Sequence, residues 1–169
     1  IKKHDGHISV SSEHGRGTRF EIHLPAAAAA LPARTPLEEN IERGQGRVLV
    51  MDDEKIVREI AGEMLRTLGY EVTTANNGAE ALTLYRQAME ERNPFSLVIM
   101  DLTVPGGMGG KEAITLLKAM DPLVKAIVSS GYSNDPIMAD YESHGFKNVI
   151  IKPYNISSFS RIIREAIER

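Results

Sequence analysis

Five polar side chains with acid, hydroxyl or ammonium groups follow short apolar runs at widely separated points of the sequence. Asp52 and Asp53 follow "RVLVM", and Asp101 follows "FSLVIM". A pair of serines, of which Ser129 is the first, ends "VKAIVSS", and Lys152 ends "NVIIK". If these runs are parallel strands of one open sheet, their carboxyl ends meet at one edge, where such sheets bind ligands. The five groups would then share a site.

Carboxylates brought together at such an edge repel one another, so either their pKa values rise or a cation neutralises them. A divalent cation is favoured here. Oxygen ligands without His or Cys suit Mg²⁺, which keeps several waters and binds one or two carboxylates together with phosphate oxygens. Mg²⁺ and Lys152 could screen the charge of a transferring phosphoryl group while one carboxylate attacks it in line. The cluster therefore predicts a site that handles phosphoryl groups.

The elements that must position these residues alternate along the chain. Apolar runs predict strands at 47–52, 70–75, 95–100, 124–130 and 148–152, four of them nearly continuous, as in parallel strands buried on both faces. Helical spacing and end signals predict helices at 56–68, 78–92, 111–121, 136–145 and 156–169. The alternation indicates an α/β fold, a flavodoxin-like (βα)5 three-layer sandwich with the parallel sheet order 2-1-3-4-5.

Composition divides the 169 residues into three predicted parts. Residues 1–24 contain two alternating runs joined by "EHGRG", which predict a β-hairpin, and 47–169 hold the α/β domain. Between them, 25–46 is rich in Ala and Pro and is typical of a linker. Because the chain begins at Ile1 rather than Met, we expect it to be cut from a longer polypeptide.

Overall charge and composition exclude several classes of protein. A net charge of −3 gives no electrostatic basis for binding nucleic acid. The absence of Cys excludes disulfides and thiolate metal sites, and no run approaches the ~20 apolar residues of a membrane span. We expect a cytoplasmic domain that makes no membrane contact itself, although the parent protein could be anchored upstream.

The Asp52–Asp53 pair, Asp101, Ser129 and the Lys152-Pro153 step together resemble the response-regulator receiver domain over about 47–169. The resemblance implies that Asp101 accepts a phosphoryl group from a phosphohistidine and later loses it by hydrolysis or onward transfer.

The resemblance also implies a set of ligands around that acceptor. Asp53, Asp101 and the backbone carbonyl of Thr103 would bind Mg²⁺, with Asp52 acting through water. Ser129 and Lys152 would contact phosphoryl oxygens, and Lys152 would hold Asp101 before phosphorylation. The Lys152–Pro153 bond is a candidate cis peptide, because cis bonds cost little only before proline.

Two features depart from the receiver pattern. Val149 stands three positions before Lys152, where receivers usually carry an aromatic residue whose rotation reports phosphorylation. Tyr132 and Tyr154 are nearby aromatic residues, but neither is assigned this role, and output could run through loop and helix shifts instead. The loop "DLTVPGGMGGKE" is also longer and richer in Gly than usual. It would be mobile, and it is either a functional hinge or a locally adapted turn.

The N-terminal segment "HDGHISVSSEHGRGTRFEIHLP" resembles the last hairpin of the ATP-binding domain of sensor histidine kinases. The chain would then be the C-terminal receiver of a hybrid sensor histidine kinase. Its phosphohistidine donor would be its own kinase core or a histidine phosphotransfer protein, and a downstream response regulator is a possible further partner. Without the nucleotide lid we expect no kinase activity from this chain, only receiver self-phosphorylation and autodephosphorylation.

Two other functions remain possible from the sequence. A haloacid-dehalogenase-like phosphatase also uses a strand-end Asp with Mg²⁺, but it needs an acid two residues later, where Thr103 stands. A pseudo-receiver would be an interaction module that never carries phosphate, and the intact acidic and Lys positions argue against it.

Overall fold

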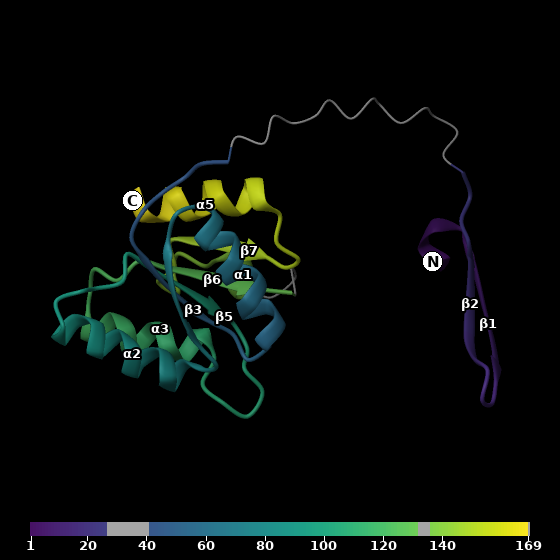
Figure 1. Ribbon diagram of the computed structural model, residues 1–169, viewed down its shortest axis with the longest axis horizontal. Coiled ribbons are helices and arrows are strands. Elements are labelled where there is room, and N and C mark those ends of the chain that lie inside the picture. Colours follow the sequence, from purple (N-terminus) through teal and green to yellow (C-terminus); the bar gives the residue numbers. More distant parts are fainter. Residues whose placement is uncertain (27–40, 132–135, 169) are drawn as a thin grey trace. The chain divides into compact units, whose positions relative to one another are not determined.

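The computed structural model describes residues 1–26, 41–131 and 136–168. The chain divides into two compact units, Ile1–Glu38 and Glu39–Arg169 (Figure 1). Most of the predicted linker, residues 27–40, lies outside the described residues, as does Tyr132.

The first unit contains the predicted hairpin. A short 3₁₀ turn, Lys2–His4, precedes strands β1 (His7–Glu13) and β2 (Gly17–His23), which pair antiparallel with Val10 opposite Phe20. Gly15 and Gly17 have positive φ, which glycine adopts without a steric penalty and which lets the chain reverse. Every residue of both strands is exposed within this unit, so its apolar face lacks a core of its own.

The second unit is built on a parallel five-stranded sheet, as the sequence predicts. Its strands are β3 (Arg47–Met51), β4 (Glu71–Ala75), β5 (Leu97–Asp101), β6 (Ala126–Ser130) and β7 (Asn148–Ile151). The spatial order is β4-β3-β5-β6-β7, with every neighbouring pair parallel. Counted within this unit, that is the expected order 2-1-3-4-5, and the flavodoxin-like fold is confirmed.

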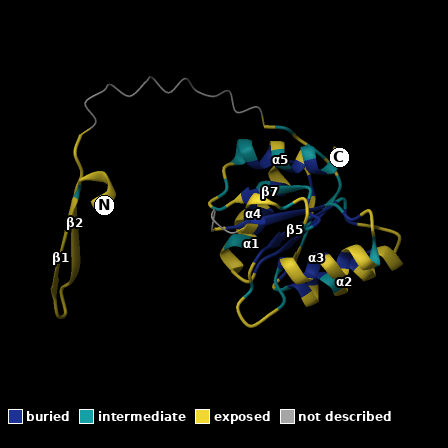
Figure 2. Ribbon diagram, turned by 180° about the vertical axis from the view of Figure 1, so that it is seen from behind, coloured by how far each residue is buried: buried dark blue, intermediate teal, exposed yellow. Residues whose placement is uncertain are grey.

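Helices cover both faces of this sheet and make two separate cores. They are α1 (Lys55–Thr67), α2 (Gly78–Glu90), α3 (Gly110–Met120), α4 (Pro136–Ala139) and α5 (Ile156–Glu168). Residues of α2, α3 and α4 pack in one core cluster, and residues of α1 and α5 pack in the other. Figure 2 shows the buried strands between these helical layers. Alternate residues of β3 enter the two cores, Leu49 on one face and Val50 on the other.

One predicted helix is wrong in extent. The segment 136–145 is helical only over Pro136–Ala139, and the chain then turns. The Ser143 hydroxyl donates to the backbone carbonyl of Asp140 at 3.0 Å and lies 2.6 Å from its carboxylate. Such local side-chain bonds compete with the helical ladder. Gly145 follows with a φ of 96°, which ends any helical continuation.

Candidate functional site

The acidic residues of the predicted site converge at the carboxyl edge of the sheet. Asp52 directly follows β3, and Asp101 is the last residue of β5, the neighbouring strand. Carboxylate oxygens of Asp52, Asp53 and Asp101 lie within 4.8 Å of one another. Asp52 and Asp101 are buried, whereas Asp53 is exposed. An all-oxygen donor set of this kind fits Mg²⁺.

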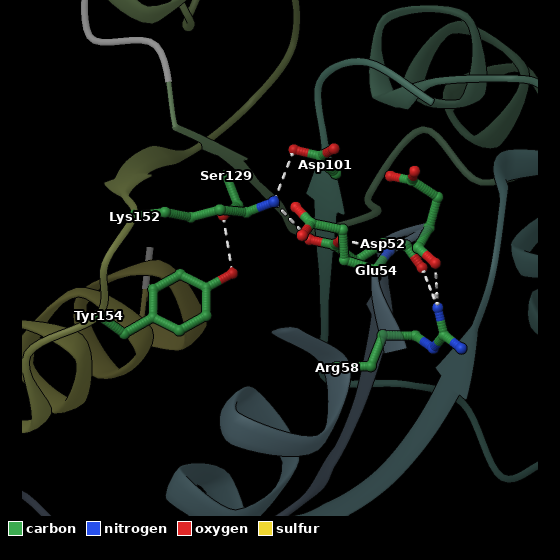
Figure 3. A network of polar contacts seen from close by, with 8 residues as sticks. Asp52, Glu54, Arg58, Asp101, Ser129, Lys152 and Tyr154 are labelled. Atoms are coloured by element: carbon green, nitrogen blue, oxygen red, sulfur yellow. Dashed lines mark hydrogen bonds and ion pairs between the residues drawn. The ribbon is translucent and has the colours of Figure 1, made fainter. Parts of the chain in front are cut away.

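Lys152 joins two of these carboxylates. Its Nζ lies 2.6 Å from Asp52 Oδ2 and 3.0 Å from Asp101 Oδ1 (Figure 3). The Lys152–Pro153 peptide bond that follows is cis, as expected. Burial raises the pKa of the Asp101 carboxyl, although the Lys152 ammonium opposes this. Burial alone would lower the pKa of Lys152, but its hydrogen bonds with Asp52 and Asp101 raise it above its ordinary value. The lysine is therefore a fixed positive charge at this edge.

A depression of about 520 Å³ opens over the acidic cluster. Asp53, Asp101, Thr103, Ser130 and Lys152 are among the residues that line it. Thus the structure brings together the predicted metal ligands, the predicted acceptor and the predicted ammonium group.

The predicted hydroxyl residue, Ser129, lies deeper and faces a different partner. Its side chain is buried, and its Oγ shares a hydrogen bond of 2.9 Å with the hydroxyl of Tyr154. The neighbouring Ser130, and not Ser129, lines the depression beside Asp101 and Lys152. Successive side chains of a strand point to opposite faces, so the two serines cannot occupy equivalent positions at this edge.

Arg58 is a residue of this region that the sequence interpretation missed. It lies in the first turn of α1, and its guanidinium Nη1 donates to the backbone carbonyls of Asp52 at 2.6 Å and Asp53 at 2.9 Å. The amide of Glu54 donates to Asp52 Oδ1 at 3.0 Å. These bonds fix the acidic turn between β3 and α1 (Figure 3). In the sequence, Arg58 is recognisable only as an arginine about one and a half helical turns after an acidic pair. That spacing is common on exposed helices and does not by itself indicate a role.

The glycine-rich loop after β5 passes close to the acceptor strand. A Cβ at Gly110 would lie 2.7 Å from the backbone oxygen of Asp101, and a Cβ at Gly109 would lie 2.5 Å from that of Leu102. Gly106 has a φ of +70°. A larger side chain at Gly109 or Gly110 would clash with the nearby backbone, and one at Gly106 would strain the positive φ. The glycines are therefore explained by the shape of the turn, which favours a locally adapted turn over a functional hinge.

The sequence profile of the response regulator receiver domain matches residues 48–164. The chain belongs to the response-regulator receiver family. It is 33% identical to the chemotaxis protein CheY of Thermotoga maritima, over 66% of this chain and 88% of that protein. It is 29% identical to the sensor kinase CckA of Brucella abortus, over 100% of this chain but only 18% of that protein.

Solved receivers agree with this assignment. A response regulator receiver domain from Clostridium thermocellum has a TM-score of 0.64 at 27% identity, over 73% of this chain and 95% of its own. The response regulator TrrA of Thermotoga maritima, solved in complex with Mg²⁺ and beryllium fluoride, has a TM-score of 0.61 at 30% identity, over 72% of this chain and 98% of its own. The chain is thus a receiver domain of two-component systems. It spans less than a fifth of the sensor kinases that it matches.

Two further observations concern the rest of the receiver. Among the described residues, no helix is long and apolar enough to cross a membrane.

Val149 lies on β7 beside Val128 of β6 and packs against the core cluster of α2 and α3. A valine there fills space but offers no hydroxyl.

Proposed function

We propose that this receiver accepts a phosphoryl group on Asp101 from a phosphohistidine. The convergence of three carboxylates and Lys152 at one edge of the sheet carries the proposal. An Asp101 carboxylate oxygen attacks phosphorus, forming an O–P bond as the P–N bond to the imidazole breaks. The imidazole leaves with the electron pair and takes a proton. The acyl phosphate then loses its phosphoryl group to water or to a further acceptor.

Mg²⁺ supports this chemistry by screening the charge on the phosphoryl oxygens. Asp53, Asp101 and the backbone carbonyl of Thr103 would hold it. All three residues line the depression, and Asp53 is exposed enough to bind an ion directly. Asp52 is 1% exposed and already accepts from Lys152 and from the Glu54 amide, which favours its contact through water.

For the hydroxyl that contacts a phosphoryl oxygen, the depression favours Ser130 over the predicted Ser129. Ser130 lines the space beside Asp101 and Lys152, and Ser129 is not among the residues that line it. Ser130→Ala should therefore slow phosphorylation by a small-molecule phosphodonor more than Ser129→Ala. Equal rates in the wild type and Ser130→Ala, with a slow Ser129→Ala, would restore the original assignment.

The decisive experiment is incubation with acetyl phosphate and Mg²⁺ followed by intact mass measurement. One phosphate adduct is expected in the wild type and none in Asp101→Asn. An adduct that persists in Asp101→Asn would overturn the acceptor assignment, because the phosphate would then sit on another residue. Absence of an adduct from the wild type would overturn the phosphoacceptor function and favour a pseudo-receiver. Beryllium fluoride should bind only with Mg²⁺, and Asp53→Ala should abolish this binding. ATP hydrolysis and autokinase activity should be undetectable.

We further infer that this receiver belongs to a hybrid sensor histidine kinase, with 1–24 the end of the ATP-binding domain and 25–46 a linker. Matches to sensor kinases extend over the N-terminal segment, covering 100% of this chain for CckA and 95% for the sensor histidine kinase AruS of Pseudomonas aeruginosa. Its donor would be its own kinase core or a phosphotransfer protein, in the cytoplasm, with a response regulator as a possible recipient. Phosphotransfer from the purified kinase core would test this.

A further inference from the structure

Tyr154 occupies the short segment between the acceptor edge and α5. It stands two residues after Lys152 and two residues before the first residue of α5, Ile156. Its hydroxyl lies 2.9 Å from Ser129 Oγ, and Ser129 is paired with Asp101 in the register of β5 and β6. Figure 3 shows Tyr154 reaching Ser129 beneath the extended side chain of Lys152. One hydrogen bond therefore connects the segment before α5 to the strand beside the acceptor.

The ring of Tyr154 is tied to α5 by packing. Its centroid lies 5.2 Å from that of Phe159, and the two planes are tilted by 47°. Phe159 is fully buried in the core cluster shared by α1 and α5, and Tyr154 packs against the same cluster. Burial also raises the pKa of Tyr154, so its hydroxyl keeps its proton at neutral pH. A displacement of Tyr154 would have to move the first turn of α5 or break this contact.

On the opposite face of the sheet, the usual aromatic position holds a valine. Val149, at the position of the usual aromatic residue, packs in the other core cluster and has no polar side-chain atom. Its side chain cannot form a hydrogen bond with a serine of β6. Tyr154, which packs on the α1 and α5 side, does form one, with Ser129.

We propose that Tyr154 is a positioning residue that links the acceptor edge to α5 through its hydrogen bond with Ser129. This inference rests on the proposed function of Asp101. Before phosphorylation, Lys152 is held by Asp52 and Asp101. When Lys152 turns toward a phosphoryl oxygen, the 152–154 segment shifts against β6, the Tyr154–Ser129 bond adjusts, and the first turn of α5 follows through Phe159.

The test is an amide NMR titration of the full chain with beryllium fluoride in the presence of Mg²⁺. In the wild type, shifts are expected at the acceptor edge, near Asp53 and Asp101, and in the first turn of α5. Tyr154→Phe keeps the ring but removes the hydroxyl. It should reduce the α5 shifts by about half or more while leaving those near Asp53 and Asp101 at full size, because the coupling and not the binding is lost.

Two further variants distinguish coupling from a general loss of structure. Ser129→Ala should reproduce the effect, and the double variant should add nothing, as expected for two partners of one contact. Tyr85→Phe is the matched control, because it also removes a buried tyrosine hydroxyl that is hydrogen-bonded, here to Asp121. Its α5 response should equal that of the wild type.

The outcomes separate this inference from the function on which it rests. A wild-type chain without a Mg²⁺-dependent response at Asp101 would overturn the proposed function and the inference together. A normal response at Asp101 with full α5 shifts in Tyr154→Phe would overturn the inference alone. Loss of the α5 shifts in Tyr85→Phe would also overturn it, because the effect would then reflect any lost tyrosine hydroxyl.

Discussion

Replacing Lys152 with methionine removes the ammonium group but keeps a long apolar side chain. In the wild type, the ammonium contacts Asp52 at 2.6 Å and Asp101 at 3.0 Å. Those two residues are 1% and 7% exposed, so water can reach their carboxylates only in part. We therefore expect Lys152→Met to destabilise the receiver when no divalent cation is present.

The size of the loss follows from burial. Removing one partner of a buried ion pair costs about 3–5 kcal/mol, because the remaining charge loses its compensation. The Lys152 side chain is 15% exposed, and protonation of Asp101 can relieve part of the repulsion. We expect about 2–3 kcal/mol at neutral pH.

The loss should depend on pH in a defined direction. Burial already raises the pKa of Asp101 in the folded state, and removal of Lys152 raises it further. A carboxyl whose folded pKa is raised destabilises the fold when it is charged. The cost of Lys152→Met should therefore be largest above that folded pKa and should shrink as the pH falls through it.

Urea unfolding followed by circular dichroism measures this cost, first with a chelator and then with Mg²⁺. A cation on the carboxylates replaces the missing charge, so Mg²⁺ should bind Lys152→Met more tightly than the wild type, and each tenfold difference in affinity lowers the cost by about 1.4 kcal/mol at saturating Mg²⁺. Lys111→Met, which removes an exposed lysine of α3, is the control and should stay within about 0.5 kcal/mol of wild type. If Lys152→Met costs no more than this control, or if its cost is unchanged by Mg²⁺, the charge-compensation argument is wrong.

Other parts of the receiver give further predictions. Arg58→Gln frees the backbone of the acidic turn and should weaken Mg²⁺ binding about tenfold by calorimetry, as loss of a supporting contact does; an unchanged Kd would refute this positioning role. Tyr85→Phe loses a 2.7 Å hydrogen bond to Asp121 and should cost about 1 kcal/mol in urea unfolding without slowing phosphorylation. Gly110→Ala places a methyl group against the Asp101 backbone and should cost about 1–3 kcal/mol and slow phosphorylation; wild-type stability and rate would show that the loop adapts.

The sheet could be predicted well because its signal is distributed over many residues. The five apolar runs had to be buried on both faces, and right-handed crossovers leave few orders for five such strands. The helix predicted at 136–145 failed because its outcome depends on a few local bonds. Ser143 forms hydrogen bonds with Asp140 there, and the hydrophobic periodicity of the sequence does not indicate these bonds.

The sequence predicts those site residues that stand at the ends of strands. Asp52, Asp53, Asp101 and Lys152 end or follow strands, so the topology alone brings them together. Arg58 acts from within a helix on backbone oxygens, and its role requires the geometry of the β3–α1 turn. A side chain that binds backbone atoms cannot be recognised from the residue types around it, because every residue has the same backbone carbonyl.

The two serines of β6 are neighbours in the sequence but face opposite sides of the sheet. A shift of one residue along a strand reverses the face to which a side chain points. Val128 lies in the core cluster of α2 and α3, and Ile127 in that of α1 and α5. Ser129 therefore falls on the α5 face with Tyr154, and Ser130 falls on the face of Val149. Both serines stand at the same strand end, and the pleat of the strand places Ser130 at the depression and Ser129 against Tyr154.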